Sequence, residues 1–236
     1  PEIINVIKNT VIISFGKLFI GTSSCVIMAL LLNELRSHLY KRVVQTFLYL
    51  PHFLSWIIMA GIVYNIFTIS GGLFNKIITV VFNRPPIQVL AKPEYFRAIV
   101  FSTYVWKSVG FGSIIYLAAI AGINPQLYEA AIIDGSNRFR RIWHITLPGM
   151  RPTIVILLIL NMSNIMNAGF DQIYNLYSPM VHSVGDIIDT YVYRHGIQLM
   201  EYSYTAALDV FKQVINLTLL LIVNKAAQLL GQESIY

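Results

Sequence analysis

Five long apolar segments limit what this 236-residue chain can fold into. A helix needs about 20 predominantly apolar residues to cross roughly 30 Å of hydrocarbon. Segments that approach or exceed this length occupy residues 10–33, 43–67, 98–121, 153–170 and 205–230. The pattern predicts an all-α integral membrane protein: a polytopic helical bundle with five spans, forming a single transmembrane domain over residues 1–236.

The low charge content argues against the alternative, a soluble bundle of five buried helices. Only 12% of the residues are charged, whereas 56% are hydrophobic. That is about half the charged fraction of an average soluble domain, and a soluble chain of this size must keep a large charged surface in water. Cys25 is the only cysteine and lies within the first segment, so we expect a packing role and no intrachain disulfide.

Basic residues in the short loops predict the orientation. Arg36, Lys41 and Arg42 follow the first segment, and a second basic group, with Arg138, Arg140, Arg141 and Arg151, follows the third. The positive-inside rule places both loops in the cytoplasm and the loops after the second and fourth segments outside. Five spans then place the two termini on opposite sides of the membrane.

A polar, basic stretch, EAAIIDGSNRFRRIWHITLP, interrupts the apolar segments at residues 129–148. Asn124 as N-cap and Pro125 in the first turn predict a helix over residues 126–133. Gly135 permits a turn, and a second helix is expected over about 138–145, which prolines 148 and 152 should end before the next span. The residues alone leave two readings open: a lever gripped by a partner protein, or an amphipathic helix resting on lipid.

This stretch resembles the EAA loop of permeases from binding-protein-dependent ATP-binding-cassette importers. The matching residues are Glu129, Ala130, Ala131, Asp134, Gly135, Ile145, Leu147 and Pro148, and the chain departs from the pattern at Ser136 and at Ile142–Trp143. The resemblance implies a cytoplasmic coupling loop over residues 122–152 that docks on an ATPase subunit. The coupling residues would be Glu129, Ala130, Ala131, Asp134, Gly135, Leu147 and Pro148.

Three further stretches, residues 33–56, 112–131 and 186–204, look like the branch of this family that imports oligo- and polysaccharides. The resemblance implies six or more spans in the full chain, with at least one upstream of residue 1. It also implies a location in the bacterial cytoplasmic (inner) membrane and a set of partners. These are a second homologous permease in a heterodimer, two ATPase subunits, a periplasmic or extracellular solute-binding protein, an oligosaccharide substrate and membrane lipid, with no nucleic acid.

Motifs for enzymatic chemistry are absent from the sequence. It contains no G-x-x-x-x-G-K-[ST] phosphate loop, no H-E-x-x-H, no clustered Cys/His spacing and no G-x-S-x-G elbow. We therefore expect no catalytic residues, no metal site and no cofactor bound by this chain, which would not be an enzyme. ATP and Mg²⁺ would bind in the partner ATPase.

Polar residues inside the apolar segments mark a candidate substrate pathway. A charge at the centre of a membrane helix costs at least about 2.5 kcal/mol and normally faces a cavity or a partner. At 100° per residue, the three asparagines and Asp171 of the fourth segment should share one face. The candidate residues are Lys17, Trp106, Lys107, Asn161, Asn164, Asn167, Asp171, Asp209, Lys212 and Asn216. The alternative is hydrogen bonding between helices, with an Asp209–Lys212 pair at i,i+3.

Amide groups beside aromatic rings suit carbohydrates, and three in-span lysines against two acids would attract an acidic glycan of the alginate type. Two other functional classes stay open from the residues alone. One is a secondary, ion-coupled transporter with Asp171, Asp209 and the lysines as its relay, and the other is a membrane scaffold. The tyrosines of the second outer loop would serve either as membrane-interface anchors or as contacts for the binding protein: Tyr174, Tyr177, Tyr191, Tyr193, Tyr202 and Tyr204.

Overall fold

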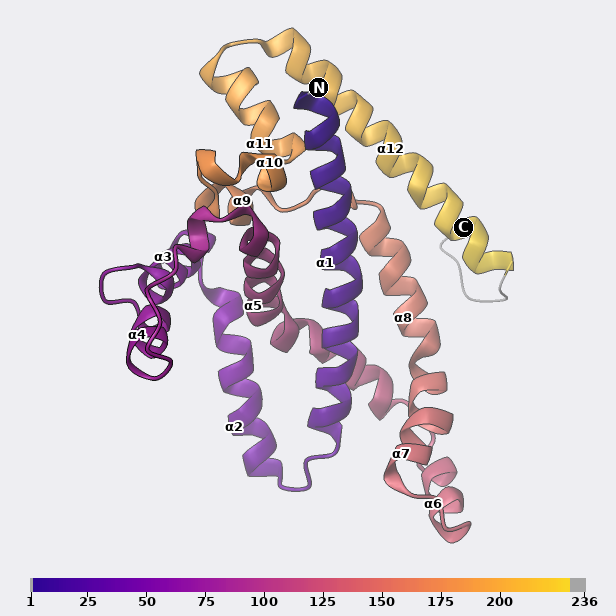
Figure 1. The fold of residues 1–236 in the computed structure, drawn as a ribbon. Coiled ribbons are helices and arrows are strands. Elements are labelled where there is room, and N and C mark those ends of the chain that lie inside the picture. Colours follow the sequence, from indigo (N-terminus) through magenta and orange to yellow (C-terminus); the bar gives the residue numbers. More distant parts are fainter. Residues whose placement is uncertain (1, 230–236) are drawn as a thin grey trace. The chain divides into compact units, whose positions relative to one another are not determined.

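The computed structural model describes residues 2–229, and within them the chain is helical and contains no strand, as Figure 1 shows. This confirms the all-α prediction. The long helices are α1 (Glu2–Asn33), α5 (Pro93–Ala121), α8 (Leu147–Met162) and α12 (Tyr202–Leu229). The shorter helices are α2 (His38–Tyr49), α3 (Trp56–Phe67), α4 (Leu73–Val80), α6 (Pro125–Ile133), α7 (Arg138–Arg141), α9 (Phe170–Leu176), α10 (His182–Gly185) and α11 (Ile188–Val192).

Five short turns of other helical geometry complete the fold. Three are 3₁₀ turns, at Leu50–Phe53, Val89–Ala91 and Pro179–Val181. Two are π-helical, at Ile142–Thr146 and Tyr193–Gln198. The first π turn lies in the predicted coupling loop, where it changes the expected connection to α8.

Four helical stretches are long and apolar enough to cross a membrane: Glu2–Asn33, Pro93–Ala121, Arg138–Met162 and Tyr202–Ala226. A fifth span is formed if the pair His38–Phe53 and Trp56–Phe67 counts as one broken span. The chain is therefore a multi-pass membrane protein with four or five spans, in agreement with the prediction. Residue 230, the last of the expected fifth span, lies outside the described residues.

The second apolar segment, expected as one helix over residues 43–67, is instead interrupted at Leu54 and Ser55. Pro51 has no backbone N–H to continue the hydrogen-bond ladder of the preceding helix. Ser55 then starts a new helix, because its hydroxyl accepts a hydrogen bond from the Ile58 N–H at 3.3 Å. The break follows from local side-chain chemistry that the hydropathy of the segment hides.

The fourth apolar segment, expected over residues 153–170, also differs from the prediction: α8 begins earlier and ends at Met162. Ser163 donates a hydrogen bond to the Leu160 carbonyl at 2.7 Å, and Asn164 donates to Ser163 at 3.0 Å. Such local side-chain bonds compete with the helical ladder. Gly169 then adopts a left-handed φ of 89°, so residues 163–169 are non-helical.

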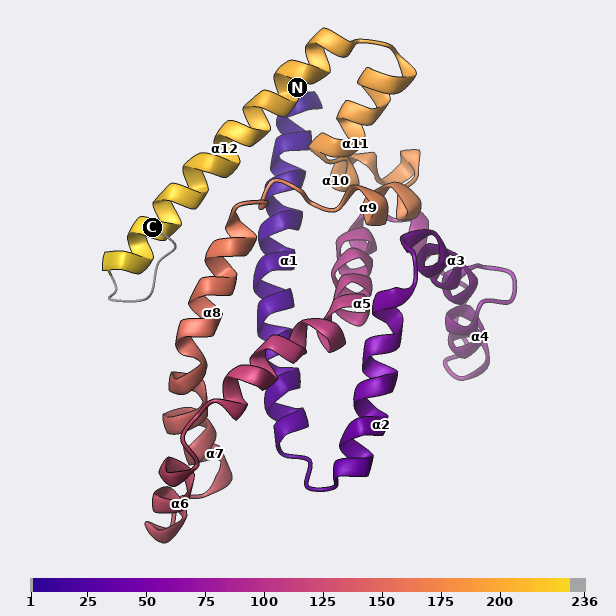
Figure 2. The same cartoon turned by 180° about the vertical axis from the view of Figure 1, so that it is seen from behind.

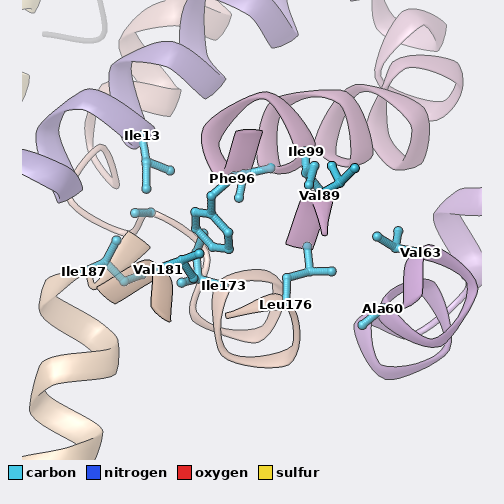
Figure 3. Packing of buried hydrophobic residues seen from close by; sticks show 12 residues of the cluster. Ile13, Ala60, Val63, Val89, Phe96, Ile99, Ile173, Leu176, Val181 and Ile187 are labelled. Atoms are coloured by element: carbon cyan, nitrogen blue, oxygen red, sulfur yellow. The ribbon is translucent and has the colours of Figure 1, made fainter. Parts of the chain in front are cut away.

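The chain divides into two compact units. Unit 1 contains the chain up to Lys17, Phe53–Tyr104 and Ile165–Ile215, and unit 2 contains Leu18–His52, Val105–Asn164 and the chain from Asn216. Figure 3 shows the core of unit 1, in which Phe96 of α5 packs with Ile173 and Val181. Gly185 lies so close that a β-carbon there would meet the Phe96 ring at 2.4 Å.

A polar network joins three parts of unit 1 that are far apart in sequence. In both Figure 1 and Figure 2, α10 and α11 lie beside the N-terminal part of α1. Asn9 of α1 donates to the backbone carbonyls of Ser183 and Asp186 at 3.2 and 3.1 Å. Arg97 of α5 donates to the side-chain amide oxygen of Asn9 at 2.9 Å, and Arg194 pairs with the Asp186 carboxylate at 2.7 Å. These bonds fix the segment that precedes α12.

Unit 2 depends on a very close approach between α5 and the end of α2. A β-carbon on Gly110 would lie 2.0 Å from the Leu48 carbonyl oxygen, which is backbone and cannot turn away. The neighbouring core combines α1, α5 and α8 through residues that include Val26, Tyr116 and Met150. Cys25 is buried there, and a β-carbon on Gly112 would meet its sulfur at 2.7 Å. The thiol is thus a packing residue, as expected.

We predict that Gly110→Ala lowers the thermal unfolding midpoint of the purified protein in detergent. The added methyl group must push α2 and α5 apart, and overpacking of this kind costs about 1–3 kcal/mol or more. Gly61→Ala is the matched control, because nothing lies within 4 Å of its β-carbon position. Alanine should stabilise helix α3 there by up to about 1 kcal/mol. Equal midpoints for the two variants would contradict this account of the helix contact.

Candidate functional site

The first helix of the predicted coupling loop is α6, and its start agrees with the prediction. Pro125 is the first residue of α6, and the Asn124 side chain accepts a hydrogen bond from the Gln126 N–H at 3.0 Å. Glu129 and Ala130 are exposed, whereas Ala131 is half-buried. The acid and the alanine are therefore available on the surface of α6.

The turn between α6 and α7 is rigidly built. Gly135 adopts a φ of 74°, a left-handed conformation that favours glycine. The Ser136 N–H donates to the Ala131 carbonyl at 2.8 Å, which closes the end of α6. Asn137 caps α7 by accepting from the Arg140 N–H at 2.9 Å, and the exposed Asp134 ends α6. Gly135 thus forms the turn that the sequence predicted.

The connection from α7 to α8 corrects one prediction: the prolines do not end the second helix. Helical structure runs without a break from Arg138 to Met162, through the π turn at Ile142–Thr146. In this turn the Leu147 N–H donates to the Ile142 carbonyl, five residues back. Pro148 stands in the first turn of α8, where its missing N–H is tolerated, and Pro152 lies inside the helix. The wider turn absorbs the prolines and keeps the loop joined to the span.

The predicted coupling loop is held together by side-chain contacts and exposes apolar groups. The hydroxyls of Tyr128 and Thr146 are 3.0 Å apart, which ties α6 to the π turn. Leu147 packs against the core of unit 2, and Pro148 is exposed. Large apolar side chains are nevertheless exposed on α6, on α7 and in the π turn: Leu127, Ile132, Ile133, Phe139 and Trp143, of which Ile133 and Phe139 are about 85% exposed. Exposed apolar groups of this size, beside the arginines of α7, can bind another protein.

The sequence predicts that the asparagines of the fourth segment and Asp171 share one face of a single helix, and this prediction is wrong. Asn161 is on α8, Asn164 and Asn167 lie in the non-helical stretch, and Asp171 is in the first turn of α9. All four are exposed, while Met162, Ile165, Met166 and Ala168 between them are buried. Asn161 and Asn164 belong to unit 2, and Asn167 and Asp171 to unit 1.

The three in-span lysines each have a specific protein partner. Lys17 donates to the Ala168 carbonyl oxygen, and Lys107 donates to the His52 carbonyl oxygen at 2.7 Å. Lys212 pairs with the Asp189 carboxylate on α11. The Asp209–Lys212 pair of the alternative interpretation is therefore wrong: among the described residues Lys212 pairs with Asp189 instead, and Asp209 is exposed. No sequence signal pointed to these partners, which lie in other parts of the chain: a non-helical stretch, a 3₁₀ turn and α11.

The remaining pathway candidates differ in exposure. Trp106 is 41% exposed, whereas Asn216 is buried and only 2% exposed. The outer-loop tyrosines also divide, since Tyr191 is buried against α1 and Tyr202 is 61% exposed. Within residues 2–229, no group of three or more His, Cys, Asp or Glu side chains is placed to hold a metal ion.

Electrostatics in the segment between α11 and α12 centre on Arg194, which the sequence did not mark as a candidate site residue. Burial lowers the pKa of Arg194, but its hydrogen bond and charge pairing with Asp186 outweigh this effect and raise the pKa above its usual value. Burial, followed by the charge of Asp186, raises the pKa of Tyr177. The arginine thus keeps its charge at any physiological pH.

Comparison with known proteins identifies the family to which this chain belongs. The family model described as "Binding-protein-dependent transport system inner membrane component" matches residues 21–230. Protein LplB of Bacillus subtilis (strain 168) is 41% identical over 236 residues, which cover all of this chain and 74% of LplB. The polygalacturonan/rhamnogalacturonan transport system permease protein YteP of the same organism is also 41% identical, with coverage of 100% and 73%.

A solved structure is similarly close. A chain in the crystal structure of a bacterial alginate ABC transporter, in complex with alginate pentasaccharide-bound periplasmic protein, matches with a TM-score of 0.96 at 38% identity. The match covers 100% of this chain and 81% of that one. Together with the family match and the helical coupling loop, it leaves one assignment: the chain belongs to the inner membrane permease components of binding-protein-dependent ABC transport systems.

Proposed function

We propose that this chain is one permease subunit of an ATP-driven importer of oligo- or polysaccharides in the bacterial cytoplasmic membrane. It pairs with a second, homologous permease, and two ATPase subunits bind Mg²⁺ and ATP and carry out hydrolysis. A binding protein outside the cell or in the periplasm delivers the substrate. This chain then needs no cofactor and catalyses no reaction. Membership of the family favours ATP over an ion gradient as the energy source.

The observation that carries the proposal is the exposed apolar surface of the coupling loop, joined without a break to a span. Ile133, Phe139 and Trp143 would be covered by an ATPase subunit, because water-exposed apolar groups of this size mark protein contacts. A push on α7 then moves α8 directly, since both belong to the continuous stretch Arg138–Met162. Residues Glu129, Ala130, Ala131, Asp134, Gly135, Leu147 and Pro148 give the loop its shape and contact surface.

We predict that Phe139→Asp abolishes co-purification of the ATPase subunits and the hydrolysis that substrate stimulates. An aspartate at the centre of a buried contact would be desolvated without a partner, which costs several kcal/mol. Co-purification followed by an ATPase assay in proteoliposomes measures both effects.

The control for this experiment is Phe82→Asp. Phe82 is 63% exposed and follows α4 in the first outer loop, so its replacement should leave assembly unchanged. If Phe139→Asp retains the ATPases as well as Phe82→Asp does, α7 is not the docking surface.

The substrate class rests on relatives and on the polar groups of the chain. YteP is named for polygalacturonan and rhamnogalacturonan transport, and a further matched structure is described as importing the acidic polysaccharide alginate. Galacturonate units carry carboxylates, so we propose an acidic oligosaccharide for this chain as well. In unit 2, the exposed Asn161 and Asn164, with Trp106, offer the amide groups and ring that sugar hydroxyls and C–H faces require, and in unit 1 the exposed Asn167 offers a further amide.

We predict that Asn164→Leu raises the KM for oligosaccharide uptake about tenfold, because the loss of one polar contact is worth about 1.4 kcal/mol. Uptake of a labelled oligosaccharide into proteoliposomes measures the KM. Asn65→Leu on α3 is the control: Asn65 is exposed and donates to the Gly61 carbonyl of its own helix. An unchanged KM in Asn164→Leu would remove this residue from the pathway.

The lysines now have different expected roles. Lys212 is neutralised by Asp189, so it adds no net attraction for an acidic glycan. Lys107 is half-buried and donates to the carbonyl oxygens of Pro51 and His52. Asp171 and Asp209 are exposed and face the substrate or solvent.

We predict that Lys107→Gln, which keeps a hydrogen-bond donor but removes the charge, lowers uptake of an oligogalacturonide about fivefold relative to a neutral oligosaccharide. The factor corresponds to about 1 kcal/mol of attraction across an aqueous pathway. Competitive uptake of the two labelled sugars gives the ratio. An unchanged ratio would show that Lys107 does not select for acidic substrates.

A further inference from the structure

Lys17 is a buried cation on α1, within unit 1. Its side chain is buried at 7% exposure, and its ammonium group lies 5.4 Å from the centre of the Tyr104 ring. Its hydrogen bond goes to the backbone carbonyl of Ala168, 151 residues away in sequence. A lysine held inside a membrane protein is expensive, so it normally serves a purpose.

The carbonyl that Lys17 binds lies at a helix break. Ala168 is completely buried and belongs to the non-helical stretch between α8 and α9. A carbonyl there has no partner in a helical ladder, and the hydrocarbon region supplies no water to replace one. The ammonium of Lys17 therefore satisfies a backbone group that the break leaves open.

Gly169 makes this contact possible. Its left-handed φ of 89° sets the direction of the preceding peptide, and a β-carbon at this position would lie 2.8 Å from Lys17 Nζ. Only glycine combines this backbone with room for the ammonium group. Two residues thus fix the peptide unit between Ala168 and Gly169: Lys17 binds its carbonyl oxygen, and Gly169 sets its direction.

Asn167 is the residue whose position depends on this peptide. It is exposed directly before the buried Ala168, and Asp171 is exposed in the first turn of α9, two residues after Gly169. When the Ala168 carbonyl is held, the backbone that carries Asn167 cannot rotate freely. Lys17 thereby restricts the position of the exposed Asn167, although Lys17 itself is buried.

We propose that Lys17 is a positioning residue for substrate binding: by holding the Ala168 carbonyl, it orients Asn167 toward the transported saccharide. The inference rests on the proposed function, in which Asn167 contacts the substrate. It assigns Lys17 a role other than attracting an acidic sugar, because the ammonium is buried and committed to the protein. Lys17 therefore acts equally on acidic and neutral sugars.

The test uses the intact transporter in proteoliposomes, with an oligogalacturonide and a maltooligosaccharide as probes. Lys17→Met keeps the length of the side chain and removes the donor. We expect it to raise the KM of every probe that stimulates ATP hydrolysis roughly tenfold, with kcat changed less than twofold. Hydrogen exchange of residues 165–169 should become faster. Lys8→Met on the exposed side of α1 is the matched control and should change neither.

Three results would overturn the proposal. The first is a KM in Lys17→Met equal to that in Lys8→Met. The second is a rise confined to the acidic probe, which would make Lys17 an electrostatic selector. The third is a loss of kcat at unchanged KM. If Lys17→Met does not assemble, Gly169→Ala disturbs the same peptide and must give the same rise in KM, so an unchanged KM there also overturns the proposal.

Asn167→Leu separates this inference from the proposed function. If it raises the KM while Lys17→Met does not, the positioning role fails and the substrate contact stands. If Asn167→Leu leaves the KM unchanged, the contact itself fails, and with it the claim that Lys17 acts through Asn167. Supporting results are parallel rises in both variants and less than additive effects in the double variant.

Discussion

The whole structure depends on how backbone carbonyls are satisfied where helices break inside the membrane. Hydrocarbon offers no hydrogen bonds, so a broken helix needs a donor from elsewhere in the protein. In unit 1 the Lys17 ammonium binds the Ala168 carbonyl, and in unit 2 Lys107 binds the carbonyls of Pro51 and His52. Two breaks are thus each stabilised by a lysine from another helix. Without these breaks, α2 would continue into α3 and α8 into α9.

The predicted coupling loop differs from these breaks, because its second helix continues into the span where proline would be expected to end it. The π turn at Ile142–Thr146 gives the backbone the extra residue that Pro148 requires. The short helix α7 and the span α8 therefore form one continuous helical stretch. A permease that receives force from a separate ATPase gains from this continuity, since a flexible joint would absorb the movement.

Sequence reasoning predicted the features that depend on local chemistry. Apolar segments of about 20 residues located the spans, and Asn124, Pro125 and Gly135 located α6 and its turn. It missed two kinds of feature. The break at Leu54–Ser55 has a local cause but is hidden inside a continuous apolar run, whereas the bond from Lys17 to Ala168 depends on a contact between residues 151 positions apart. The sequence therefore predicted sugar attraction for all three in-span lysines, although Lys17 is buried against the Ala168 carbonyl and Lys212 pairs with Asp189.

The most direct test of the account asks whether Arg138–Met162 moves as one rigid piece. Spin labels at Arg140→Cys and Leu160→Cys, in a Cys25→Ser background, are separated by 20 helical residues, or about 30 Å. Both positions are exposed. Electron–electron double resonance on the intact transporter gives their distance with and without ATP. The account predicts the same distance in both states, and a change of more than about one helical turn, roughly 5 Å, would contradict it.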